Sequence, residues 1–79
     1  MKKVEVGSRV RVLDIDEDME LLYRVTGVLP SGHNLSRPDG RVVSRESPVG
    51  SSLLGRTVGE TVDIHTPGGV LHYEILEIN

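Results

Sequence analysis

The sequence contains no cysteine, no phenylalanine and no tryptophan, and Tyr23 and Tyr73 are its two aromatic residues. Without cysteine there is neither a disulfide nor a thiolate metal site, which is typical of proteins from a reducing compartment. With so few aromatic side chains, we expect neither a base-stacking platform for nucleic acid nor an aromatic-lined ligand pocket. The core must therefore be built from valine, leucine and isoleucine.

The chain also lacks a long apolar segment and an excess of positive charge. No run approaches the roughly 18 apolar residues of a membrane span, and residues 1–5 lack the apolar stretch of a signal peptide. Twelve acidic residues against nine Lys and Arg give a net charge of −3, which argues against non-specific binding to nucleic acid. These absences favour a cytoplasmic protein that does not bind a membrane. The length of 79 residues predicts a single domain over residues 1–79.

The sequence predicts one short helix at about residues 48–54. Ser47 is a suitable N-cap, because its hydroxyl can accept a hydrogen bond from a free amide of the first turn. Pro48 then falls at the first helical position, where its missing N–H costs nothing. Gly55 supplies the left-handed residue that ends the helix. A helix this short must pack on the neighbouring strands, and its apolar face comprises Val49, Leu53 and Leu54.

Alternation of apolar and polar residues predicts the strands. They are Arg9–Leu13, Glu20–Val28, Arg41–Ser44, Thr61–His65 and Val70–Ile78, preceded by a short leading strand at Val4–Val6. The stretch between residues 29 and 41 is rich in turn-forming residues. In the last strand the apolar parity changes, so we expect a bulge near Ile75 and Leu76. Strands and helix do not alternate, which predicts an α+β fold of four to five antiparallel strands with one helix.

Two groups of residues are candidate metal ligands. A turn after the first strand carries four carboxylates: Asp14, Asp16, Glu17 and Asp18. A calcium loop needs a central glycine and a glutamate at its twelfth position, where this chain has Val25, so we predict a solvated turn. His65 and His72 are expected to face outward on the last hairpin, where no third ligand accompanies them. We therefore predict no metal and no cofactor.

Several motifs together resemble the C-terminal domain of the Gre-type transcript cleavage and elongation factors. They are Ser47-Pro48, Leu53-Leu54-Gly55, Val58-Gly59 and Thr66-Pro67-Gly68-Gly69, at matching spacing. The segments VGSRVRVLDID and YRVTGV are similar to the opening hairpin of that family, so the resemblance covers nearly the whole chain. It implies an FKBP-like fold, in which an antiparallel sheet curls around one short helix.

The resemblance also implies a partner, bacterial RNA polymerase. The family binds the coiled coil at the rim of the polymerase secondary channel, and the corresponding contact residues here are Glu46, Ser47 and Pro48. Helix capping alone also explains Ser47 and Pro48. Glu46 precedes the cap and gains little from the helix dipole, so it is the clearer candidate for a contact. Nucleic acid would be reached only indirectly, through the polymerase, and we expect a monomer.

The resemblance does not extend to catalysis. The family's cleavage activity depends on acidic residues at the tip of a long N-terminal helical hairpin, whereas the carboxylates at residues 14–18 lie on a sheet turn. We therefore expect a transcription elongation factor domain that is not an enzyme. We expect a domain excised from a longer factor, with a natural short relative as the alternative. Two other functions are a prolyl isomerase, by analogy of fold, and a passive folding or dimerisation module with exposed edge strands.

Overall fold

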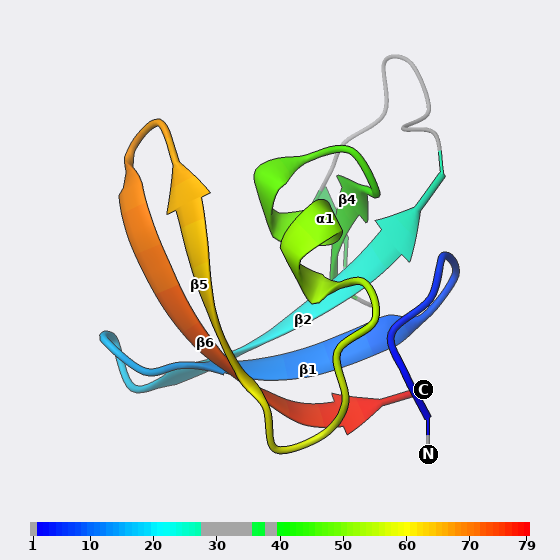
Figure 1. The fold of residues 1–79 in the computed structure, drawn as a ribbon, viewed down its shortest axis with the longest axis horizontal. Coiled ribbons are helices and arrows are strands. Elements are labelled where there is room, and N and C mark those ends of the chain that lie inside the picture. The colour runs from blue at the N-terminus through cyan, green and yellow to red at the C-terminus, as the bar shows by residue number, and fades with distance from the viewer. Residues whose placement is uncertain (1, 28–35, 38–39) are drawn as a thin grey trace.

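The computed structural model describes residues 2–27, 36–37 and 40–79, which form one curled sheet with a short helix on its concave side (Figure 1). The elements in chain order are β1 (Arg9–Asp14), β2 (Met19–Thr26), β3 (Ser36–Arg37), β4 (Gly40–Ser44), α1 (Pro48–Leu53), β5 (Thr61–Thr66) and β6 (Gly69–Ile78). The predicted α+β class is confirmed. Across these ranges no helix is long and apolar enough to cross a membrane.

The strands are arranged in the order β3-β4-β2-β1-β6-β5. β1 is central and pairs antiparallel with β2 on one side and β6 on the other. β4, however, runs parallel to β2, with Arg41 opposite Tyr23 and Ser44 opposite Thr26. The prediction of a purely antiparallel sheet is wrong at this pair. Parallel neighbours need a connection of a dozen or more residues, and residues 27–39 provide that length.

The N-terminal segment does not form the leading strand predicted at Val4–Val6. Val4 is instead buried against the turn that follows α1. Its N–H donates to the carbonyl of Arg56 and its carbonyl accepts from the N–H of Gly55, both at 2.9 Å. A different short strand, β3, lies in the stretch where only turns were predicted. The rest of that stretch, at 28–35 and 38–39, lies outside the described residues.

The predicted bulge in the last strand is confirmed. Val10 lies opposite Ile78 and Val12 lies opposite Ile75, so Leu76 is the extra residue on β6. The bulge changes the parity of β6, and both of its isoleucines therefore face the core. The buried core comprises Val4, Val10, Val12, Tyr23, Val25, Leu53, Val62, Ile64, Tyr73, Ile75 and Ile78.

Helix α1 begins where the sequence predicts, with Ser47 as its N-cap and a proline as its first residue. Its last residue is Leu53, and Gly55 has the predicted left-handed conformation with a φ of 81°. Leu53 is fully buried, whereas Val49 and Leu54 pack against the core while partly exposed. One leucine therefore anchors this short helix to the sheet.

Candidate functional site

The predicted site lies in the turn between β4 and α1. Glu46 is exposed, and its carboxylate makes no hydrogen bond or ion pair with any of the described residues. Its backbone is held in place, because the Glu46 N–H donates to the Oγ of Ser44 at 2.9 Å. The turn thus presents an exposed carboxylate from a defined backbone position.

Ser47 fixes the shape of this turn. Its Oγ accepts from the N–H of Gly50 at 3.0 Å and donates to the carbonyl of Ser44 at 2.7 Å. Its own N–H donates to the same carbonyl at 3.0 Å. These three bonds join the end of β4 to the first turn of the helix, so Ser47 determines how the strand and the helix meet.

Gly50 permits the close approach on which this turn depends. A Cβ at Gly50 would overlap the backbone carbonyl of Ser44. Sequence reasoning missed this role. The one available signal was a glycine inside a six-residue helix, where glycine costs about 1 kcal/mol relative to alanine. Pro48, at the first helical position, is exposed and follows the exposed Glu46 by two residues in this turn.

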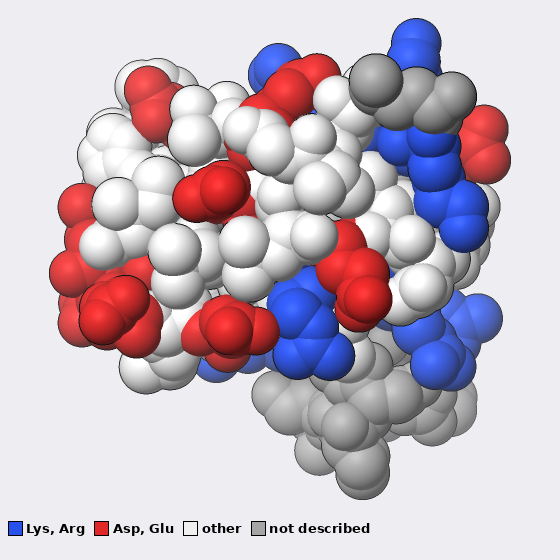
Figure 2. Space-filling model, turned by 90° about the horizontal axis from the view of Figure 1, so that it is seen from below, with Lys and Arg blue, Asp and Glu red and all other residues white. Residues whose placement is uncertain are grey.

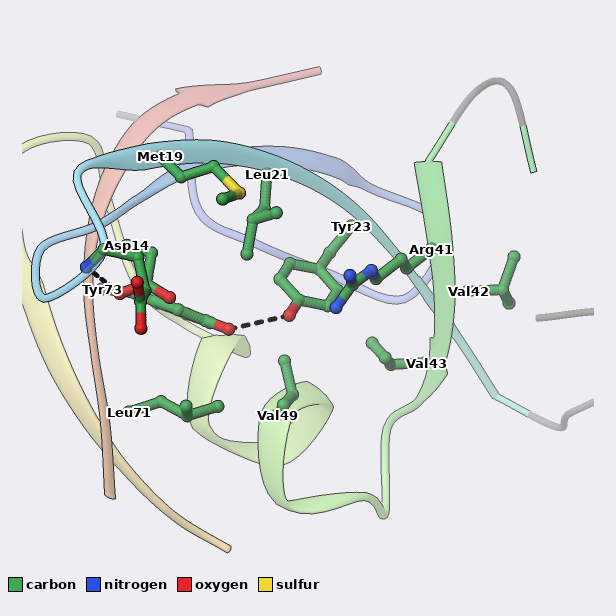
Figure 3. A pocket seen from close by; sticks show the side chains of 11 residues that line it. Asp14, Met19, Leu21, Tyr23, Arg41, Val42, Val43, Val49, Leu71 and Tyr73 are labelled. Atoms are coloured by element: carbon green, nitrogen blue, oxygen red, sulfur yellow. Dashed lines mark hydrogen bonds between the residues drawn. The ribbon is translucent and has the colours of Figure 1, made fainter. Parts of the chain in front are cut away.

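A groove lies next to the start of α1, between this helix and the concave face of the sheet (Figure 3). Its volume is about 610 Å³, and the residue that follows Pro48, Val49, points into it. The lining residues are Asp14, Glu17, Met19, Leu21, Tyr23, Arg41, Val42, Val43, Val49, Leu71 and Tyr73. The sequence predicts no aromatic-lined pocket, yet both tyrosines line this groove.

The two tyrosines form a hydrogen-bonded pair within the groove. Their hydroxyl oxygens are 2.9 Å apart and their ring centroids 5.8 Å apart. Burial, together with the hydrogen bond between its hydroxyl and that of Tyr23, raises the pKa of Tyr73 well above its usual range. The Tyr73 hydroxyl is therefore neutral at physiological pH and acts as a hydrogen-bonding group, not as an anion.

On the face that Figure 2 shows, acidic side chains are densest at one side and Lys and Arg at the other, with some of each kind between them. The acidic residues cluster on the side of the β1–β2 turn, and Lys and Arg on the side where β2 ends and the N-terminus lies. In that turn Asp16, Glu17 and Asp18 are exposed, and Asp14 Oδ1 accepts from the N–H of Glu17 at 3.2 Å. Over the described part of the chain, no group of three or more His, Asp and Glu side chains is arranged to hold a metal ion.

His72 connects the acidic turn to the last hairpin. Its Nδ1 lies 2.8 Å from Asp63 Oδ1, and its Nε2 lies 4.0 Å from Asp16 Oδ2. The hydrogen bond to Asp63, followed by the charges of Asp16, Asp63 and Asp14, raises the pKa of His72 above its ordinary value. Protonation of His72 is therefore favoured in the folded protein relative to the unfolded chain.

This shift predicts a pH-dependent contribution to stability from His72. Because its folded pKa is raised, the contribution is complete below the unfolded pKa of about 6.5 and is lost as the pH rises through the folded pKa. We expect His72→Gln to lower the melting temperature at pH 5.5 and to have little effect at pH 9. Thermal denaturation of both proteins across this range measures the difference.

His65→Gln is the matched control for that experiment. His65 is exposed on β5, and its side chain makes no hydrogen bond or ion pair with the described residues. We expect its substitution to leave the melting temperature unchanged at both pH values. A cost of His72→Gln that is equal at pH 5.5 and pH 9 would contradict the role given to the protonated ring.

Comparison with known protein families shows which family this chain belongs to. The family model described as "Transcription elongation factor, GreA/GreB, C-term" matches residues 1–79. The chain belongs to the GreA/GreB family. The resemblance inferred from the Ser-Pro, Leu-Leu-Gly and Thr-Pro-Gly-Gly motifs is thereby confirmed. The matched region is the C-terminal part of these GreA/GreB factors.

Curated GreA proteins are similar to nearly all of this chain. Transcription elongation factor GreA of Caulobacter sp. (strain K31) is 39% identical over 77 residues, which is 98% of this chain and 46% of the relative. GreA of Clostridium perfringens (strain 13 / Type A) is 41% identical over 75 residues, which is 95% of this chain and 44% of the relative. The chain thus spans about half the length of the curated GreA relatives that it matches.

Solved structures of GreA/GreB relatives share the fold. The GreA factor homolog 1 (Gfh1) protein of Thermus thermophilus matches with a TM-score of 0.78 and 27% identity, covering 99% of this chain and 49% of that one. A GreA/GreB elongation factor from Nitrosomonas europaea matches with a TM-score of 0.68 and 31% identity, and the match covers 94% of this chain and 58% of that one. The curled sheet with one short helix is consistent with the predicted FKBP-like fold.

Proposed function

We propose that this chain is the polymerase-docking domain of a bacterial Gre-type elongation factor and performs no chemistry of its own. Its partner is RNA polymerase, at the coiled coil on the rim of the secondary channel. Glu46 and Pro48 make the contact, and Ser47 holds the turn in the required shape.

The observation that carries this proposal is the exposed Glu46 carboxylate on a fixed backbone. Its N–H is bonded to Ser44 and its side chain has no partner among the described residues, so contact with a basic group on the polymerase displaces no internal interaction. A charge-assisted hydrogen bond of this kind contributes about 1.5–3 kcal/mol. The exposed Pro48 adds a rigid apolar contact beside it.

The test is binding of the domain to bacterial core RNA polymerase. We expect Glu46→Lys to weaken binding about tenfold or more, because it replaces an attractive charge by a repulsive one. We expect Pro48→Ala to weaken binding about threefold through lost apolar contact area. Circular dichroism confirms that each variant is folded before its dissociation constant is measured.

Two control variants make the same chemical changes elsewhere. Glu5→Lys reverses an exposed charge that also has no side-chain partner among the described residues, and Pro67→Ala removes an exposed proline from the β5–β6 turn. Neither is expected to change binding more than about twofold. Equal binding by wild type, Glu46→Lys and Pro48→Ala would show that the docking surface lies elsewhere. Absence of binding by the folded wild-type domain would reject the proposed function.

A further inference from the structure

The N-terminal segment, residues 2–8, runs beside the connection that follows α1 (Figure 1). Val4 attaches the segment there through two backbone hydrogen bonds, one to Gly55 and one to Arg56, both of 2.9 Å. The Val4 side chain is 2% exposed and belongs to the buried core. The segment is therefore held at the C-terminal side of α1 by its backbone and by its side chain.

Arg56 joins this attachment point to the end of the helix. Its N–H donates to the carbonyl of Leu53, and its Nε donates to the carbonyl of Ser52, both at 3.1 Å. These bonds satisfy carbonyls that the end of a helix otherwise leaves without a partner. Because the Arg56 carbonyl accepts from Val4, the N-terminal segment and the last turn of α1 belong to one hydrogen-bonded unit.

The other end of the segment reaches the strand that supports the proposed contact residues, Glu46–Pro48, which we call the docking turn. The Gly7 N–H donates to the carbonyl of Val25 in β2 at 2.7 Å. The next residue of β2, Thr26, accepts from the N–H of Arg45 at 2.7 Å, and Arg45 directly precedes the docking turn. The segment is thus connected to both sides of α1, directly at the C-terminal side and through the end of β2 at the N-terminal side.

We infer that residues 2–8 position the docking turn, and that Val4 is a positioning residue for polymerase binding. This inference rests on the proposed function. Val4 is too deeply buried to touch a partner, so its effect on binding must pass through α1. A helix of six residues keeps its place only through its neighbours. Release of Val4 therefore lets α1 move and takes the docking turn out of the geometry that binds the polymerase.

Hydrogen exchange of the free domain measures how firmly the segment holds α1. The amides to follow are those of Gly50, bonded to the Ser47 Oγ, and Leu54, bonded to the Gly50 carbonyl. We expect Val4→Ala to speed their exchange about tenfold, because truncation of a buried side chain lowers the free energy of local opening. Val12→Ala is the matched control, since Val12 is another buried valine but lies in the central strand β1. We expect this control to have no preferential effect on α1.

Binding to bacterial core RNA polymerase measures whether the hold on α1 reaches the docking turn. We expect Val4→Asp to release the segment, because a carboxylate cannot stay buried without a partner. Its binding should weaken about fivefold, the loss expected when about one domain in five keeps α1 in the binding position. Val4→Ile keeps a branched apolar side chain and is expected to bind within about twofold of wild type. Val12→Ala should bind like wild type at temperatures where circular dichroism shows that it is folded.

The outcomes distinguish this inference from the proposed function. If Val4→Asp binds like wild type while Glu46→Lys binds more weakly, the docking turn stands and the positioning role of Val4 is rejected. If Val12→Ala weakens binding as much as Val4→Asp, the loss reflects general destabilisation and the inference is wrong.

The exchange measurement decides the case in which Val4→Asp does not fold. A selective effect of Val4→Ala on the α1 amides then supports the inference, and equal effects of Val4→Ala and Val12→Ala reject it. If the folded wild type does not bind the polymerase, the proposed function is rejected and the positioning role is rejected with it, even where exchange shows that Val4 holds α1.

Discussion

Gly50→Ala is expected to destabilise the domain by about 2–3 kcal/mol, which lowers its melting temperature by about 10–20 °C. Alanine normally stabilises a helix relative to glycine, by about 1 kcal/mol. Here the sign reverses, because the new Cβ would overlap the Ser44 carbonyl, a backbone atom that cannot move aside by changing rotamer. Thermal denaturation followed by circular dichroism measures the shift.

Ser51→Ala is the control for Gly50→Ala. Ser51 is the next residue of α1 and is exposed, and among the described residues its hydroxyl makes one hydrogen bond, a long one of 3.4 Å to the Pro48 carbonyl. We expect this variant to be as stable as wild type or slightly more stable, because alanine has the higher helix propensity. A Gly50→Ala variant that melts at or above the wild-type temperature would show that the strand end and helix can separate without cost.

Leu53→Ala is expected to cost about 3 kcal/mol of unfolding free energy. Leu53 is fully buried and is the helix residue most deeply packed in the core. Its loss leaves a cavity under a helix of six residues, which has little stability apart from its packing. Urea denaturation should show a lower midpoint with an unchanged slope if the variant still folds cooperatively.

Leu54→Ala tests whether the position of the leucine matters. Leu54 follows Leu53 directly but is only partly buried, so its truncation is expected to cost about 1 kcal/mol. The sequence pattern places both leucines on one apolar face without ranking them. Equal losses for the two variants would mean that the helix is anchored by the whole face and not by Leu53.

The features predicted correctly from the sequence depend on neighbouring residues. The Ser47 cap, the helical start at Pro48 and the left-handed Gly55 each follow from chemistry within one helical turn. The bulge at Leu76 could be predicted because apolar residues that change parity along one strand can share a face only where a residue is inserted. Alternating patterns likewise located the longer strands, because burial of one sheet face imposes a period of two.

The features that were missed depend on contacts between distant segments. Tyr23 and Tyr73 are 50 residues apart and meet because β2 and β6 lie on either side of β1. The alternating pattern locates the strands that carry these tyrosines, but it does not show which strands are neighbours, so it could not place both tyrosines in one groove. The direction of β4 was missed for the same reason, since an isolated strand pattern is the same for parallel and antiparallel pairing.

The position of β6 has a consequence for how the domain forms during translation. β6 pairs with β1 on one side and with β5 on the other. Because β6 comes last in the chain, the ribosome releases both β1 and β5 before the strand that lies between them. In the described sheet, β5 has no strand partner other than β6. Completion of the sheet must wait until residues 69–78 emerge. Until then, the nascent chain depends on the polar outward residues of β5, Thr61, Asp63 and His65, to limit association of that unpaired strand with other chains.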